Sequence, residues 1–181
     1  MKIEATSLPG VLLLTPAIYR DDRGAFSETF NARQMAEAGL PTNWVQDNSS
    51  ISRKNVVRGI HYQIAQPQGK LVRVTHGAVL DVAVDLRRSS PEFGSHVAVE
   101  LSEENGKMLW IPEGFGHAFL VLSDVAGFAY KVTDYYAPSS ERTILWNDPE
   151  IGIAWPVEAT EVFVSEKDAA GKQLREAEVY P

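Results

Sequence analysis

Two of the four histidines are the strongest candidates for proton-transfer chemistry. His61 follows Arg58-Gly59-Ile60 and His117 follows Gly114-Phe115-Gly116, so each begins a predicted strand behind a glycine. Histidine suits the abstraction of a proton near neutral pH, because its unperturbed pKa is about 6.5. The pattern alone leaves each imidazole as either a site residue or a hydrogen-bonded core residue. The other two histidines are expected in a turn and on an exposed strand: His76 and His96.

The histidines do not form the pattern of a metal site. A metal centre of the kind that many small barrels hold needs several converging His, Asp or Glu ligands, commonly with a close histidine pair. Two residues after His61 and His117 come Gln63 and Phe119, so the chain has no His-x-His pair. We therefore expect no metal ligands here and no metal cofactor.

Cationic side chains that suit an anionic ligand are spread along the chain. Arg58 lies close to His61, and Arg23 lies in the loop Arg20-Asp21-Asp22-Arg23-Gly24. A planar guanidinium group matches the oxygens of a diphosphate. For any one cation the alternative is a solvated surface charge, and that alternative also stays open for the remaining candidates: Lys70, Arg73, Lys131 and Lys167. In the same way, Asp85 fits a structural ion pair near Arg87 as well as it fits a site.

The elements that must position these residues are mostly strands. Short runs of alternating apolar and polar residues, separated by turn signals, predict strands over 70–75, 81–86, 96–101, 108–111, 117–122 and 128–133. Many short strands at this spacing are typical of an all-β sandwich or barrel. Helical pattern is scarce, and the two candidates are Ala32 to Ala38 and Glu166 to Ala170, the second capped by Ser165.

One strand has the pattern of a ligand-facing surface. In Gly59 to Gln63, the polar residues His61 and Gln63 share one face and Ile60 and Tyr62 share the other. A small barrel can hold one ligand in its interior. The residues alone therefore predict a β-barrel pocket that suits an anion and contains a possible histidine base.

The composition restricts the class of function. The chain has 181 residues, no cysteine and a net charge of −7 at pH 7, which argues against non-specific binding to nucleic acid or to an anionic membrane. Its longest apolar runs are far too short to span a bilayer, and no signal-peptide core follows the first residues. We expect a single domain over residues 1–181, because no repeat or linker divides the chain, and a cytoplasmic location.

Eight stretches of the sequence together resemble the dTDP-4-dehydrorhamnose 3,5-epimerase family. They occur in family order over nearly the whole chain, at residues 21–30, 46–49, 57–63, 68–74, 81–87, 111–117, 130–136 and 144–149. Two positions depart from the family pattern. Ile60 stands where the family usually has Leu, and Gly116-His117-Ala118 stands where it usually has Ala-His-Gly. Both changes are size-neutral and lie beside the site.

The resemblance implies a fold and an activity. The fold is a small cupin-like jelly-roll β-barrel with a few short helices. The activity is that of a carbohydrate isomerase, which inverts C3 and C5 of the sugar in dTDP-4-dehydro-6-deoxy-D-glucose and forms dTDP-4-dehydro-L-rhamnose for dTDP-L-rhamnose biosynthesis. The C4 ketone acidifies both neighbouring C–H bonds, so the family uses neither a metal nor an organic cofactor.

The resemblance also assigns roles to residues. His61 is the base, Asp168 the carboxylate that pairs with it, Tyr130 the acid on the opposite face of the sugar, and Lys70 the group that stabilises charge on O4. The implied substrate-binding residues hold the diphosphate, the nucleotide and the sugar: Arg23, Phe26, Glu28, Gln46, Asn48, Arg58, His117, Glu141 and Lys167. The family is dimeric, and its N-terminal segments contribute across the interface, so Arg23 and Glu28 are expected to serve the partner's site.

Three other functions compete with this one. Some relatives invert C3 alone, and His61, Asp168 and Tyr130 fit both outcomes. A metal-dependent cupin enzyme would need the ligand set that this sequence lacks. A non-catalytic sugar-nucleotide binding barrel would not need a base, a carboxylate and an acid together.

Overall fold

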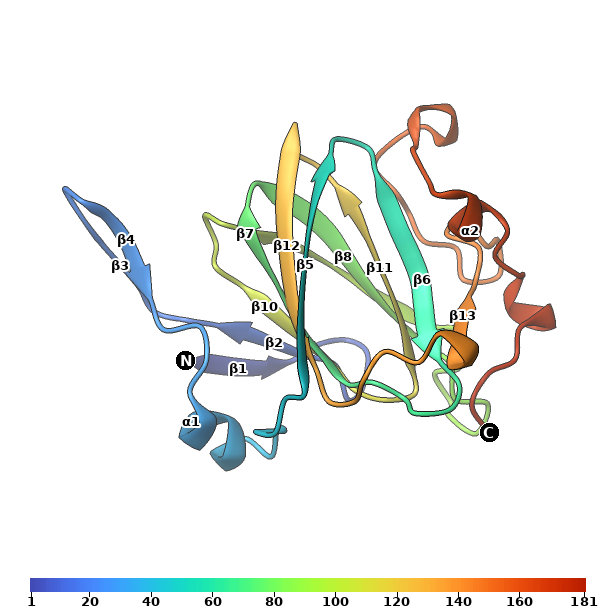
Figure 1. Ribbon diagram of the computed structural model, residues 1–181, viewed down its shortest axis with the longest axis horizontal. Helices are drawn as coiled ribbons and strands as arrows, with labels where there is room; N and C mark the ends of the chain where they lie inside the picture. Colours follow the sequence, from blue (N-terminus) through green and yellow to red (C-terminus); the bar gives the residue numbers. More distant parts are fainter.

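Two antiparallel sheets form the barrel in the computed structural model, which describes residues 1–181. The six-stranded sheet has the order β1 (Lys2–Ala5), β2 (Leu12–Thr15), β10 (Met108–Ile111), β7 (Lys70–His76), β12 (Val125–Val132), β5 (Gln46–Arg53). The five-stranded sheet has the order β13 (Glu141–Thr143), β6 (Val57–Gln63), β11 (Phe115–Val121), β8 (Ala78–Asp85), β9 (His96–Ser102). The sheets face each other (Figure 1), and the predicted all-β jelly roll is confirmed.

Apolar side chains fill the space between the two sheets. Val72 and Phe128 from the six-stranded sheet pack against Ala83, Phe119 and Val121 from the five-stranded sheet, and all five are buried. A second cluster lies behind the five-stranded sheet, where the C-terminal segment covers it (Figure 1). Because both faces of this sheet are covered, β11 is buried along its whole length.

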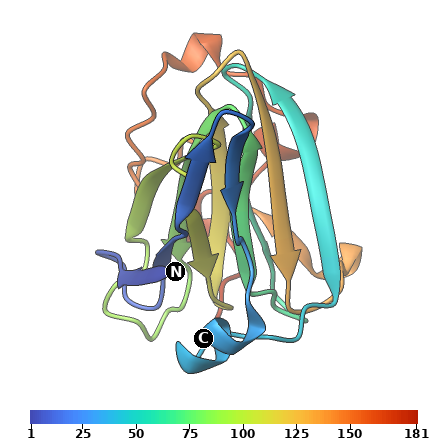
Figure 2. The same ribbon diagram turned by 90° about the vertical axis from the view of Figure 1, so that its left-hand side faces the viewer.

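The predicted strands and helices correspond closely to observed elements. Each of the six strands predicted from residue alternation overlaps one of β7 to β12. The two predicted helices are α1 (Ala32–Glu37) and α2 (Glu166–Ala169). Asn31 caps α1 by accepting hydrogen bonds from two main-chain N–H groups, and Ser165 caps α2 at the N–H of Asp168. Figure 2 shows α1 below the barrel strands. Short 3₁₀ helices occupy Pro138–Ser140, Ala159–Glu161 and Leu174–Glu176.

A hairpin of two strands projects away from the barrel (Figure 1). It consists of β3 (Ile18–Asp21) and β4 (Gly24–Ser27), which pair only with each other. The aromatic side chains of Tyr19 and Phe26 are 66% and 70% exposed. A two-stranded hairpin with exposed aromatic rings is marginal on its own in water. The hairpin is therefore an arm whose apolar surface the rest of this chain leaves uncovered.

Two hydrogen bonds hold the C-terminal residues against the outer face of β6. The Tyr62 hydroxyl donates to the main-chain oxygen of Glu178, and the Tyr180 hydroxyl donates to the oxygen of Gln63 at 2.7 Å. No helix in the structure is both long enough and apolar enough to cross a membrane.

Candidate active site

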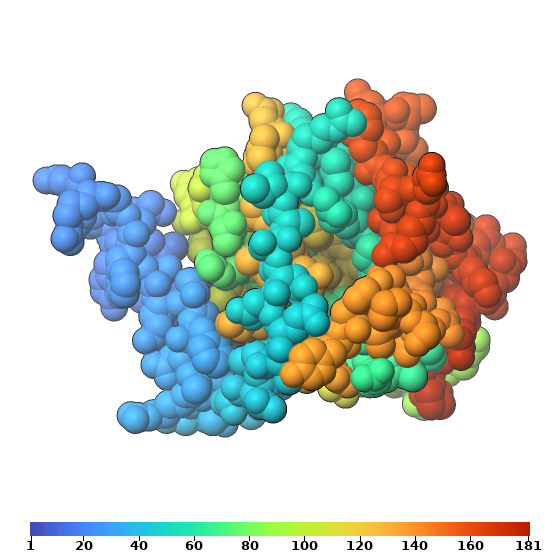
Figure 3. Space-filling model, in the orientation of Figure 1, coloured from blue at the N-terminus to red at the C-terminus, as the bar shows by residue number.

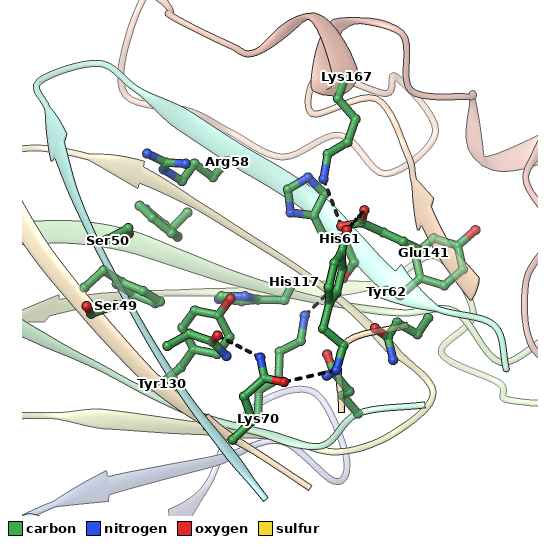
Figure 4. A pocket seen from close by; sticks show the side chains of 17 residues that line it. Ser49, Ser50, Arg58, His61, Tyr62, Lys70, His117, Tyr130, Glu141 and Lys167 are labelled. Carbon is green, nitrogen blue, oxygen red and sulfur yellow. Dashed lines mark hydrogen bonds and ion pairs between the residues drawn. The ribbon is translucent and has the colours of Figure 1, made fainter. Parts of the chain in front are cut away.

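A cavity of about 430 Å³ opens into the barrel between the two sheets. Figure 3 shows the surface hollowed between the β5 segment and the residues near position 140, and Figure 4 shows the lining side chains. The wall is largely polar, and ten of the thirteen predicted site residues lie in it or directly behind it. Nine of the predicted residues line the cavity: Gln46, Asn48, Arg58, His61, Lys70, His117, Tyr130, Glu141 and Lys167. The tenth, Asp168, lies behind His61.

His61 and Asp168 form a close pair. The Nε2 atom of His61 on β6 lies 2.6 Å from Oδ1 of Asp168, and the N–H of Gly59 donates to Oδ2 at 3.3 Å. Asp168 is 2% exposed. Burial alone would raise the pKa of Asp168, but the hydrogen bond and charge of His61 outweigh it and lower the pKa below its usual range. An ionised carboxylate here orients the imidazole and stabilises its protonated form, while the ring reaches the cavity.

Gly59 lets the two central histidines lie side by side. Its φ is +116°, and a Cβ at this position would lie 2.4 Å from the main-chain oxygen of His117. Only a glycine therefore allows β6 and β11 this close approach. In the ladder between these strands, His61 pairs with His117. Gly59, two residues before His61, is therefore explained by the close packing of β6 against β11.

Lys70 and His117 form the floor of the cavity near the base. The Nζ atom of Lys70 lies 3.4 Å from the main-chain oxygen of His61, and burial lowers the pKa of this lysine to about 8. His117 Nε2 lies 2.9 Å from Oδ2 of the fully buried Asp81. Burial also lowers the pKa of His117, despite the carboxylate beside it. The floor therefore combines a buried ammonium group with an imidazole that is neutral at neutral pH.

Tyr130 lies on β12, on a different side of the cavity from His61 (Figure 4). Burial raises the pKa of its phenol, and the charge of Glu141 adds to the effect. The phenol is therefore protonated at neutral pH and has a proton to donate into the cavity. A base and an acid that face one space from different sides are the arrangement that inversion at carbon requires.

The mouth of the cavity carries charged and amide side chains. Lys167 Nζ lies 2.8 Å from Oε1 of Glu141, and the Tyr136 hydroxyl donates to Oε2 of Glu141 at 2.9 Å. Partial burial alone would raise the pKa of Glu141, but these two hydrogen bonds and the charge of Lys167 lower it. Gln46 donates to Asn48 at 2.8 Å. Arg58, also in the cavity wall, donates to the Ser52 hydroxyl at 3.0 Å.

The remaining predicted residues do not join this cavity within one chain. Arg23 and Phe26 lie on the projecting arm, where the Arg23 side chain is 90% exposed and bonded to Asp21. Glu28 follows the arm and accepts hydrogen bonds from Asn31. Within this chain, Arg23, Phe26 and Glu28 lie outside the cavity.

Some cavity residues were not selected from the sequence. Tyr136 and Gln68 line the wall. Each lies in a loop with other polar residues, and no motif in the sequence distinguishes it from these neighbours. Asp81 does have a signal, because a carboxylate interrupts the apolar run of β8. By contrast, Asp85 belongs to a structural ion pair, with its Oδ2 2.6 Å from Nη2 of Arg87.

No group of three or more His, Cys, Asp or Glu side chains is arranged to hold a metal ion.

This barrel and cavity define a jelly-roll enzyme that performs acid–base chemistry on an anionic ligand. The model of the dTDP-4-dehydrorhamnose 3,5-epimerase family matches residues 5–176. The chain is 52% identical to the dTDP-4-dehydrorhamnose 3,5-epimerase of Pseudomonas aeruginosa, with 100% of both chains covered. This chain belongs to the dTDP-4-dehydrorhamnose 3,5-epimerase family.

Two solved structures show what such barrels bind. A dTDP-6-deoxy-D-glucose-3,5-epimerase from Legionella pneumophila, in complex with dTDP-4-keto-L-rhamnose, is 49% identical with a TM-score of 0.94, over 98% of this chain and 94% of that one. A 3′-monoepimerase from Streptomyces bikiniensis, in complex with dTDP-quinovose, is 35% identical with a TM-score of 0.88, over 94% and 86%.

Proposed function

We propose that this protein is a 3,5-epimerase that converts dTDP-4-dehydro-6-deoxy-D-glucose to dTDP-4-dehydro-L-rhamnose. The names of its full-length relatives support this activity. The observation that carries the proposal is that His61 and Tyr130 face one cavity from different sides, with Lys70 at its floor (Figure 4), while Asp168 pairs with His61 from behind.

The chemistry follows from this placement. His61 removes the proton from C3 or C5, and the electron pair of the C–H bond moves to the C4 carbonyl oxygen. Asp168 stabilises the imidazolium that forms, and Lys70 stabilises the negative charge on the oxygen. Tyr130 then donates its proton to the same carbon from the opposite face as the electron pair returns. His61 releases its proton to water and Tyr130 regains one, so the enzyme is unchanged after each inversion.

The mouth is proposed to bind the nucleotide. Arg58 and Lys167 are the cations within reach of a diphosphate, while Gln46, Asn48 and Glu141 offer hydrogen bonds to the sugar and the base. Because the C4 ketone itself acidifies the reacting C–H bonds, the reaction needs neither a metal nor an organic cofactor.

A homodimer is proposed to complete the site. Arg23, Phe26 and Glu28 of one subunit would then reach the cavity of the other, and the exposed rings of the arm support this contact. We place the enzyme in the cytoplasm, the compartment that fits a nucleotide-sugar substrate.

Solvent exchange tests the activity directly. The protein is incubated with the 4-keto substrate in deuterated water, and NMR locates the deuterium in the sugar. Label at both C3 and C5 is the expected result. Label at C3 alone would identify a 3-epimerase, the activity of the similar protein from Streptomyces bikiniensis. The absence of label at both carbons would refute the proposal.

A further inference from the structure

The side-chain amide of Gln63 is wholly engaged by main chain at the edge of the cavity. Gln63 ends β6 and is 4% exposed. Its Nε2 donates to the oxygens of Gln66 at 2.7 Å and Tyr135 at 3.2 Å. Its Oε1 accepts from the N–H of Ala137 at 2.8 Å. Since both amide hydrogens and the carbonyl oxygen have partners, this side chain has no free donor for a substrate, although it lines the cavity.

The segments that this amide joins are parts of the site. Gln66 lies in the connection that leads from β6 to Lys70 on β7. The other two partners, Tyr135 and Ala137, are the residues on either side of Tyr136. A fixed main chain on both sides of a residue fixes the direction of its Cα–Cβ bond. The amide of Gln63 therefore anchors the backbone from which the Tyr136 side chain projects, relative to the strand that carries His61.

Tyr136 depends on such bonds because packing does not hold it. Its side chain is 51% exposed at the mouth of the cavity. Its N–H donates to Oε1 of Gln46 at 3.1 Å, and its hydroxyl donates to Glu141, which also binds Lys167. Glu141 is held independently, because the ladder between β13 and β6 pairs it with Gln63 through the main chain. The side chain of Gln63 thus acts on Tyr136 rather than on Glu141.

We propose that Gln63 is a positioning residue for nucleotide binding, which holds Tyr136 in the orientation that receives the dTDP part of the substrate. This inference rests on the proposed function, because it assigns the mouth to the nucleotide. In this proposal Gln63 contacts no substrate atom and acts on nucleotide binding through Tyr136.

The first test replaces Gln63 by a residue of similar length that cannot hydrogen-bond. For Gln63→Met, calorimetry with dTDP is expected to show a Kd raised about tenfold. The KM for the 4-keto substrate should rise by a similar factor, and kcat should stay within about threefold of wild type, because the base and the acid are untouched. Gln63→Glu, which keeps the acceptor for Ala137 and loses both donors, provides a second variant with the same expectation if the methionine variant does not fold.

A matched control separates this role from general support of the loops. Thr133 joins the same two segments without lining the cavity, because its hydroxyl accepts a hydrogen bond from the N–H of Gly69 at 2.8 Å. We expect Thr133→Val, which keeps the shape of the side chain, to change the Kd for dTDP by less than about threefold. An equal loss in both variants would overturn the specific assignment to Gln63.

A double-mutant cycle asks whether Gln63 acts through Tyr136. In a Tyr136→Ala background, Gln63→Met should weaken dTDP binding by less than about twofold further, because the residue it positions is gone. Fully additive losses, or a folded Gln63→Met protein that binds dTDP as wild type does, would overturn the inference. Wild-type protein that binds dTDP but shows no epimerisation would instead refute the proposed function, and the dTDP measurements would still test Gln63.

Discussion

His61 and Asp168 are 107 residues apart in the chain, yet Nε2 of the one lies 2.6 Å from Oδ1 of the other. The carboxylate comes from the short helix α2, whose cap at Ser165 fixes its position at the edge of β6. A buried carboxylate without a partner is costly, and this one is stabilised by the imidazole and by the N–H of Gly59. The acid–base unit of the cavity therefore forms only when the C-terminal segment docks on the barrel.

Replacement of His61 is the most direct test of its role. For His61→Asn we expect kcat to fall by about 10²–10⁴-fold, the usual loss when a general base is removed. The Kd for dTDP should change little, because the imidazole acts on the sugar C–H bonds. Steady-state kinetics and calorimetry measure the two effects. A variant that retained more than about a tenth of the wild-type kcat would exclude His61 as the base.

Many residues of this site could be predicted from residue patterns and from the family resemblance. Which side chains bond to one another in the folded site could not be predicted. Alternation identified β7 to β12, because one face of each of these strands is apolar. It missed β5, where Gln46 and Asn48 face a polar cavity and Asp47 between them is exposed. Such a strand has no apolar stripe to detect. The partners of Asp81 and Asp168 depend on strand register and on helix docking, and neither is encoded locally.

If the arm of each subunit completes the cavity of its partner, two inactive variants should complement each other in a mixed dimer. Arg23→Ala should impair activity, and His61→Asn should nearly abolish it. In a mixed dimer, the subunit with intact His61 would receive an intact arm from its partner, so mixing the two variants should restore activity. Restoration up to about a quarter of the wild-type rate is expected from random pairing, whereas arms that served their own subunits would give no restoration. Activity assays after co-refolding, with light scattering to verify the dimer, make the measurement.

Divalent metals should not affect the reaction. The ketone acidifies the neighbouring C–H bonds, and no group of metal-ligating side chains is arranged in the structure. We expect the same rate before and after dialysis against EDTA, and with added zinc, manganese or magnesium. If EDTA abolished activity and one metal restored it, a metal-dependent mechanism would replace the one proposed here.

Lys70 should produce a pH dependence. Burial lowers the pKa of its ammonium group to about 8, and the charged form is the one that stabilises an oxyanion. The value of kcat/KM should therefore fall as pH rises through about 8, and Lys70→Met should remove this limb and lower kcat by about 10²-fold.

The lowered pKa of Lys70 also makes the free energy of unfolding depend on pH. The unfolded chain keeps the Lys70 proton up to its ordinary pKa, whereas the folded protein releases it near pH 8. This group therefore makes the protein more stable as pH rises from about 8 towards 10.5. At pH 7, Lys70→Met should raise the free energy of unfolding by on the order of 1–3 kcal/mol. Denaturant unfolding at pH 7 measures this gain, and a destabilised variant would contradict the expectation.

Tyr130→Phe separates proton removal from inversion. The substitution deletes only the phenolic hydroxyl, so the tilted ring contact with Phe128 and the shape of the wall should be preserved. His61 would still remove protons from the sugar and return them to the same face. Exchange of sugar hydrogen into deuterated water should therefore persist, while the inverted product, especially at C5, falls by about 10²-fold or more.

Both quantities can be followed in one NMR time course, with the wild type and His61→Asn as references. The wild type should exchange and invert together, His61→Asn should do neither, and Tyr130→Phe should exchange without inverting. Parallel loss of exchange and inversion in Tyr130→Phe would mean that the hydroxyl supports the site without donating the proton. Tyr136, whose hydroxyl also lies at the cavity, would then be the next phenol to replace.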